Sequence, residues 1–115
     1  MYPLIYHKSL NVEKWSAYSK MQQIIMISNE LNRAKNWIIK KRNEEANLAY
    51  ERAFELIDLS SVDTKWKNVS VEFLRLKETI GELYCQTDKD LAKNNLCLKL
   101  LIAFNPESYN LLTSE

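Results

Sequence analysis

The clearest alternation of apolar and polar positions lies in residues 43–60, NEEANLAYERAFELIDLS. At 3.6 residues per turn, the apolar side chains fall on one broad face and the acidic side chains fall opposite, which predicts a helix with one buried side. Asn43 is expected to cap this helix, and Glu44 and Glu45 follow in the first turn, where the helix dipole favours negative charge. The apolar face consists of Ala46, Ala49, Tyr50, Ala53, Phe54, Leu56 and Ile57.

A second helical pattern precedes this one, from about residue 17 to residue 41, and Asn11 is a candidate cap ahead of it. One long helix fits the pattern, and so do two helices separated near Ser28 and Asn29, because both residues are good caps. Residues 1–10 are more apolar than a disordered tail, so we expect an arm that packs on its own domain or on a second copy. The periodic positions are Ala17, Met21, Ile24, Ile27, Leu31, Ala34 and Ile38.

Residues 60–64 are expected to form a loop in which Ser61 or Asp63 caps a third helix. This helix alternates spacings of three and four between apolar residues, a seam like that of a coiled coil. Its seam consists of Trp66, Val69, Phe73, Leu76, Ile80 and Leu83.

Thr87 to Asp90 matches a capping box in which the acidic residue is Asp, and it predicts a fourth helix that ends near Phe104. This helix is apolar nearly all round, so we expect it either at the centre of its domain or between two copies of the chain. Residues 105–115 are expected to form a last short turn and a tail, with Asn105 as the cap and Leu111 and Leu112 docking the turn.

The composition changes this picture little. A chain of 115 residues is one domain's worth, and 46% hydrophobic residues can fill a core. One Gly and two Pro are few for a protein rich in sheets and tight hairpins. We therefore predict an all-α fold, a four- to five-helix antiparallel bundle in a single domain, residues 1–115. The arm is residues 1–10, and the C-terminal turn and tail are residues 105–115.

The charge and the apolar runs bear on location and partners. With 16 basic and 15 acidic residues, the net charge is +1, so no bulk field attracts nucleic acid or an anionic membrane. The longest apolar run, Leu100–Phe104, is too short to span a bilayer, and no secretory signal is visible. We expect a cytoplasmic protein with no membrane association. Cys85 and Cys97 are expected to stay reduced, because a helical hairpin would separate them by roughly 13 Å.

The segment 27–60 resembles a tetratricopeptide repeat. In that family's helix hairpin, a small residue and an aromatic lie three apart on the first helix, as Ala34 and Trp37 do here. Small, aromatic and small residues follow on the second helix, as Ala46, Tyr50 and Ala53 do. The resemblance covers about a third of the chain and departs at charged Arg33. It implies one helix hairpin and peptide or protein binding; any alanine-rich helical hairpin is the alternative.

Residues that could carry chemistry are few. The chain has one histidine, His7, on the irregular arm, and the acidic stripe of the central helix is expected to be a solvated face. The basic run Lys40-Lys41-Arg42 suits a helix C-terminus and is followed at once by two glutamates. Of the three tryptophans, only Trp15 is expected at the surface. We therefore predict no enzyme activity, no cofactor and no metal.

Surplus apolar surface on a small chain usually marks an interface. We expect a homodimer that acts as a small non-catalytic interaction or assembly module, with a further protein partner as an option. A small nucleic-acid-binding or regulatory factor is the alternative, although the charge balance argues against nucleic acid. The candidate interface residues are Trp15, Ile25, Met26, Leu48, Leu96, Leu100 and Phe104.

Overall fold

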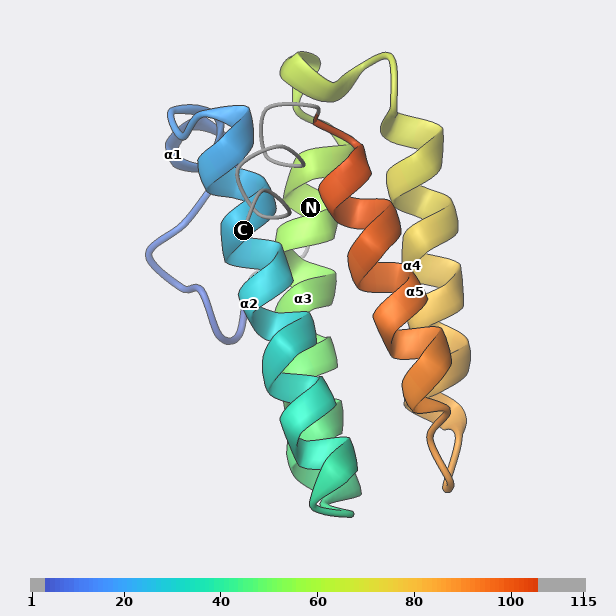
Figure 1. The fold of residues 1–115 in the computed structure, drawn as a ribbon. Helices are drawn as coiled ribbons and strands as arrows, with labels where there is room; N and C mark the ends of the chain where they lie inside the picture. The colour runs from blue at the N-terminus through green and yellow to red at the C-terminus, as the bar shows by residue number, and fades with distance from the viewer. Residues whose placement is uncertain (1–3, 106–115) are drawn as a thin grey trace.

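Four long helices form two antiparallel hairpins that close into one bundle in the computed structural model, which describes residues 4–105 (Figure 1). The first hairpin is α2 (Lys20–Ile39) with α3 (Asn43–Ser61), and the second is α4 (Ser70–Cys85) with α5 (Leu91–Ala103). A short helix α1 (Val12–Ser16) precedes them, and a 3-10 turn η1 (Thr64–Trp66) links the hairpins. Within the described residues there is no strand, and the all-α prediction is confirmed.

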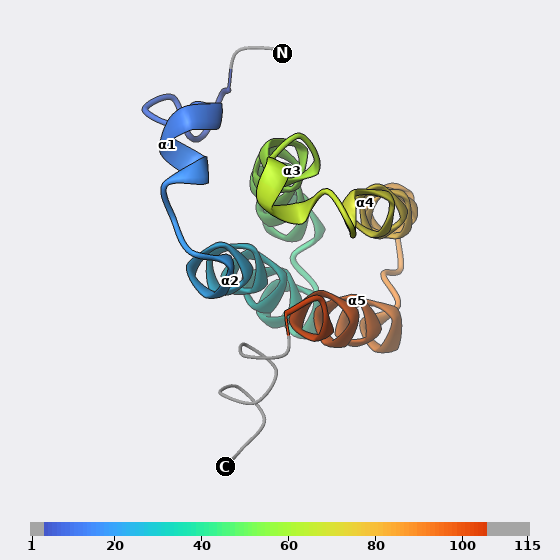
Figure 2. The same cartoon turned by 90° about the horizontal axis from the view of Figure 1, so that it is seen from above.

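Each of the four long helices packs against two others, so that the core lies between all four. Seen from above, α2 lies between α3 and α5, and α4 completes the square (Figure 2). The helix α1 packs on the outer side of α3. This arrangement buries the predicted faces: every alanine of the central stripe and every seam residue from Phe73 to Leu83 lies in the core, as does Trp66.

The N-terminal caps agree with the sequence in part. The Asn11 side chain accepts a hydrogen bond from the Lys14 amide, so Asn11 is a helix cap, but of the short α1 and not of the long helix that it was expected to cap. The helix is interrupted at residues 17–19, between α1 and α2. It is continuous at Ser28, whose hydroxyl donates to the Ile25 carbonyl inside α2. Ser19 and Gln22 form the capping box that starts α2, a cap that was not predicted from the sequence.

Three other predicted caps are wrong. Asn43 is the first residue of α3 rather than its cap, and its amide donates to the Thr87 carbonyl of the α4–α5 loop. The capping box predicted at Thr87 is wrong as well: α5 is capped by Asp90, whose side chain accepts a hydrogen bond from the Lys93 amide. Asp63 caps η1 rather than a long helix, since α4 begins only at Ser70. The predicted turn at 106–115, with Leu111 and Leu112, lies outside the described residues.

A buried hydrogen-bond chain joins three helices at mid-bundle. The Tyr50 hydroxyl donates to the Asn94 side-chain oxygen at 2.7 Å, and the Asn94 amide donates to the Leu31 carbonyl at 3.2 Å. Burial raises the pKa of Tyr50, so the phenol stays protonated and keeps its donor role. The two hydrogen bonds made by the Asn94 side chain therefore hold α5 against both α2 and α3.

We expect Tyr50→Phe to lower the free energy of unfolding by about 1–2 kcal/mol, because it leaves the buried Asn94 oxygen without a donor. Urea denaturation followed by circular dichroism measures this change. Tyr84→Phe is the matched control: Tyr84 is half-exposed and its hydroxyl lies 3.3 Å from Glu51, so the loss is expected below about 0.5 kcal/mol. Equal losses of unfolding free energy in the two variants would contradict a stabilising role for the buried Tyr50–Asn94 hydrogen bond.

Candidate interaction surface

The outer side of α5 exposes a stripe of four apolar residues. Leu96 and Leu100 are 52% and 47% exposed, and Ala92 and Ala103 are exposed one turn beyond them at either end. The spacings of four, four and three place all four on one face of the helix. The opposite face of α5 carries Asn94, Cys97 and Leu101, all buried. The all-round apolar pattern of this helix is therefore one core face plus one exposed stripe, which we call the α5 stripe.

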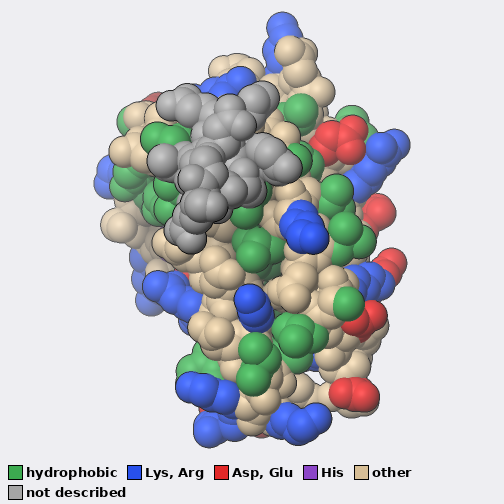
Figure 3. Space-filling view, viewed as in Figure 1, with side chains coloured by type: hydrophobic (Ala, Val, Ile, Leu, Met, Phe, Trp, Pro, Cys, Tyr) green, Lys and Arg blue, Asp and Glu red, His purple; other side chains and the backbone are tan. Residues whose placement is uncertain are grey.

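A shallow groove runs beside the α5 stripe, between α5 and α4. It has a volume of about 160 Å³. Phe104 lines the groove, and its ring packs edge-on against buried Phe73 with centroids 5.0 Å apart. Hydrophobic side chains come to the surface among charged ones on the face that shows α2 and α5 (Figure 3). The groove is lined by Glu72, Arg75, Leu76, Thr79, Leu100 and Phe104.

Charged side chains on the α4 flank border the groove. The Lys93 ammonium of α5 pairs with Glu82 of α4 and ties the two helices together near their loop. About two turns away from Glu82 along α4, Arg75 lies 3.5 Å from Glu72, and both side chains are well exposed. Such exposed pairs add little stability, so they are available to change partners.

The seven predicted interface residues do not form one surface. Leu96, Leu100 and Phe104 come together at the α5 stripe and groove, while Leu48 is exposed alone on α3. The alanines at 92 and 103 were missed, although a helical-wheel plot of the last helix would have placed them beside Leu96 and Leu100.

Three predicted residues lie on or near α1 and α2. Trp15 is fully buried and its indole N–H donates to the Ser60 hydroxyl at 3.0 Å, so the prediction that it lies at the surface is wrong. Its partner is 45 residues away in sequence, and no local pattern reveals it. Ile25 is half-buried, and Met26 packs on the core beside the N-terminal arm.

The N-terminal arm docks on the acidic face of α3. The Glu55 carboxylate accepts backbone N–H groups from Ile5, Tyr6 and His7 at 2.7 to 3.2 Å, and its Oε1 lies 2.8 Å from the His7 Nδ1. The Tyr6 hydroxyl donates to Glu51 at 2.9 Å. The prediction that the acidic stripe is a solvated face is therefore wrong for Glu55, whose side chain is only 14% exposed. The arm is therefore held on α3 by Glu55 and Glu51, and His7 contributes its backbone N–H and its ring to the contact with Glu55.

The other candidate features have structural uses in the described residues. Lys40 and Arg42 lie over the Trp37 ring, so part of the basic run covers an aromatic side chain. Cys85 and Cys97 are both free thiols; Cys85 is exposed, and burial raises the pKa of Cys97 to about 11. No group of three or more His, Cys, Asp or Glu is arranged to hold a metal ion in residues 4–105.

In comparisons with known proteins, no family model, no curated protein and no solved structure matches this chain. None of the helices between residues 4 and 105 has the length and apolar character needed to cross a membrane. The tetratricopeptide resemblance of residues 27–60 thus stays a prediction. Of its small and aromatic positions, Ala34, Ala46, Tyr50 and Ala53 are buried in the α2–α3 hairpin, and Trp37 is half-buried.

Proposed function

We propose that this protein is a small non-catalytic assembly module that acts as a homodimer through the α5 stripe. The observation that carries the proposal is the order of side-chain sizes along the stripe: Ala92, Leu96, Leu100, Ala103. Read in either direction, this order is small, large, large, small. An antiparallel second copy would set each alanine against an alanine and each leucine against a leucine, as a two-fold interface requires.

The charges on the α4 flank suit the same arrangement. A two-fold axis near the middle of the α5 stripe brings the α4 flanks of the two copies together in reverse order. Arg75 of one copy then lies toward Glu82 of the other, and the reverse pair forms by symmetry. Opposite charges at these positions favour this register over a shifted one.

The size of the surface sets the expected affinity. The helix α5 has 13 residues, which corresponds to a length of about 20 Å. Two such helices with their flanks lie at the low end of specific interface sizes, so we expect a reversible dimer with a dissociation constant in the micromolar range.

Sedimentation velocity between about 1 and 500 µM tests the proposal, because a micromolar dimer changes from mainly monomer to mainly dimer across this range. We expect Leu96→Glu/Leu100→Glu to stay monomeric at every concentration, since it would bury four carboxylates in the dimer. Leu74→Glu is the matched control: Leu74 is 50% exposed on α4 and lies outside the α5 stripe and the groove. This variant should dimerise like the unmodified chain.

Charge exchange tests the antiparallel register separately. Arg75→Glu and Glu82→Arg should each weaken the dimer, because each places like charges together across the interface. The double variant Arg75→Glu/Glu82→Arg should recover most of the affinity. A chain that stays monomeric at 500 µM, or a Leu96→Glu/Leu100→Glu variant that still dimerises, would overturn the proposal.

A further inference from the structure

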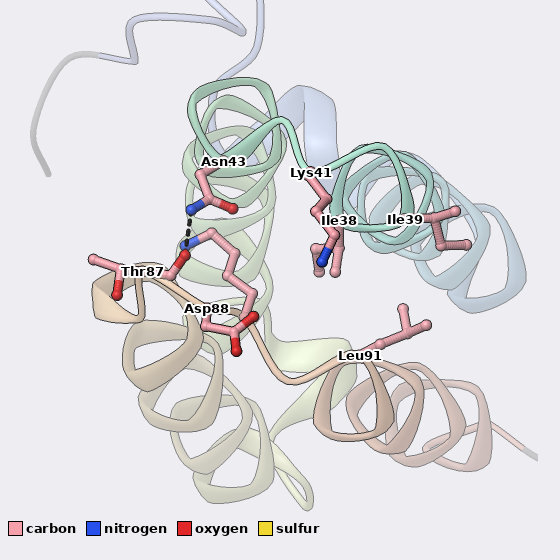
Figure 4. A pocket seen from close by; sticks show the side chains of 8 residues that line it. Ile38, Ile39, Lys41, Asn43, Thr87, Asp88 and Leu91 are labelled. Atoms are coloured by element: carbon pink, nitrogen blue, oxygen red, sulfur yellow. Dashed lines mark hydrogen bonds between the residues drawn. The ribbon is translucent and has the colours of Figure 1, made fainter.

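A cavity lies at the end of the bundle where the α2–α3 turn meets the α4–α5 loop. It has a volume of about 480 Å³ and opens between the α2–α3 turn and the α4–α5 loop (Figure 4). The hydrogen bond from the Asn43 amide to the Thr87 carbonyl joins the turn to the loop at one side of this pocket. We call this cavity the loop pocket; its lining is Ile38, Ile39, Lys41, Asn43, Thr87, Asp88, Lys89 and Leu91.

Lys41 lines the loop pocket, and its backbone is in the left-handed conformation, which is unfavourable for lysine. The helix α2 ends in a Schellman motif: the Arg42 amide donates to the Trp37 carbonyl and the Lys41 amide donates to the Ile38 carbonyl. Lys41 occupies the position where glycine is preferred, with a φ of 59°, and it is the one described non-glycine residue with positive φ. A lysine held at a strained position that lines a pocket suggests a role for its side chain there.

The two lysines of the loop pocket differ in what they can bind. The Lys89 ammonium donates to the carbonyls of Leu83, Tyr84 and Gln86 at 2.9 to 3.1 Å, which uses all three of its N–H groups. The Lys41 ammonium and the Asp88 carboxylate form no hydrogen bond or ion pair with any residue in 4–105, including each other. The loop pocket thus offers one available cation and one available carboxylate.

Apolar side chains complete the lining. Ile38 and Ile39 of α2 and Leu91 of α5 border the cavity, and Ile39 is 58% exposed. The side chains of Lys41 and Asp88 reach into the space between the turn and the loop, and Ile39 and Leu91 border it on another side (Figure 4). Separated opposite charges beside an apolar wall match a small molecule that carries the same three features.

We propose that the loop pocket binds a zwitterionic small molecule with an apolar side chain, of the α-amino-acid class. Its carboxylate would pair with Lys41, its ammonium with Asp88, and its side chain would pack on Ile38, Ile39 and Leu91. Neither charge of the ligand would have to displace an existing ion pair.

Titration of the ¹⁵N-labelled chain with leucine, followed by NMR, tests the proposal. We expect saturable shifts of the amides of residues 38–43 and 87–91, with a dissociation constant on the order of 1 mM. N-acetylleucine lacks the ammonium and leucinamide lacks the carboxylate, so each should bind about tenfold more weakly or worse. Equal binding of leucine and both analogues, or no saturable shift up to about 20 mM leucine, would overturn the proposal.

Two variants assign the charges. Lys41→Asn removes the cation and keeps a residue that tolerates positive φ, so it should abolish leucine binding while raising the urea midpoint. Asp88→Asn should also abolish binding. Lys40→Asn, a neighbour whose ammonium lies over Trp37 and outside the loop pocket, is the control and should bind leucine as the unmodified chain does. Unchanged affinity in Lys41→Asn would overturn the assigned role of that residue.

Discussion

Replacing Gln23 with leucine is expected to lower the free energy of unfolding by roughly 3–5 kcal/mol, because three buried polar groups lose a hydrogen bond at once. The Gln23 amide donates to the Trp15 carbonyl at 2.7 Å and to Asp63 Oδ2 at 3.1 Å. Its oxygen accepts the Trp66 indole N–H at 2.6 Å. Gln23 is fully buried, so water cannot replace these partners in the folded chain.

The matched control for this prediction is Gln22→Leu, the same change one residue earlier. Gln22 is exposed, and its side chain only completes the capping box with Ser19, so we expect a loss of about 1 kcal/mol or less. Thermal and urea unfolding of the two variants give the comparison. A Gln23→Leu variant as stable as Gln22→Leu would show that the network around Gln23 contributes little.

Replacing Glu55 with alanine is expected to release the N-terminal arm while leaving the four long helices intact. The carboxylate is the common acceptor for three backbone N–H groups of the arm and is paired with His7. Hydrogen bonds to a charged acceptor are each worth about 1.5–3 kcal/mol, so hydrogen exchange of the Ile5, Tyr6 and His7 amides should speed up at least roughly tenfold. Glu44→Ala, an exposed acidic position on the same helix, should leave exchange in the arm unchanged.

The same contact makes arm docking depend on pH. Burial acts to raise the pKa of Glu55, but the hydrogen bonds from the Ile5 amide, the His7 ring and the Tyr6 and His7 amides outweigh it and hold the pKa below its ordinary value of 4.5. The stabilisation is therefore fully present above pH 4.5 and is lost as the pH falls through the lower, folded-state pKa. Amide shifts of the arm should show this acid transition, and Glu55→Gln should lack it. A transition that persists in Glu55→Gln would assign it to another group.

Periodicity predicted the long helices because side-chain spacing along a helix is a local property. The faces of α2 and α3 follow directly from spacings of three and four, and most of their residues are buried as expected. The exceptions are Ala17, which is exposed and precedes α2, and the half-buried Met21, Ile38 and Phe54. The caps depend on neighbours from elsewhere in the chain. Asn11 caps its helix, whereas Asn43, the same residue type beside a helix start, instead bonds Thr87 because the fold brings the two loops together. Sequence alone does not distinguish the two.

The candidate interaction surface could also be predicted only in part. Leu96 and Leu100 are exposed because α5 carries more apolar residues than its two neighbours can cover. Trp15 was wrongly predicted to be exposed because its hydrogen-bond partner, Ser60, is 45 residues away in sequence. Gln23 was not predicted to be part of a buried network because a single glutamine within a helix has no distinguishing pattern. Glu55 was missed for a related reason: its donors are backbone groups of a segment without periodic structure.

The pairing of α2 with α5 also sets an order of events on the ribosome. The hydrogen bond from Asn94 to the Leu31 carbonyl spans 63 residues, and at about 5–20 residues per second the ribosome adds that length in roughly 3–13 s. The α2–α3 hairpin can form early in this interval, since its two helices are adjacent in the chain. Until α5 has been synthesised, the side of α2 that later packs against α5 is exposed to solvent and to chaperones. The Tyr50 hydroxyl also lacks its acceptor, the Asn94 side-chain oxygen, during this time.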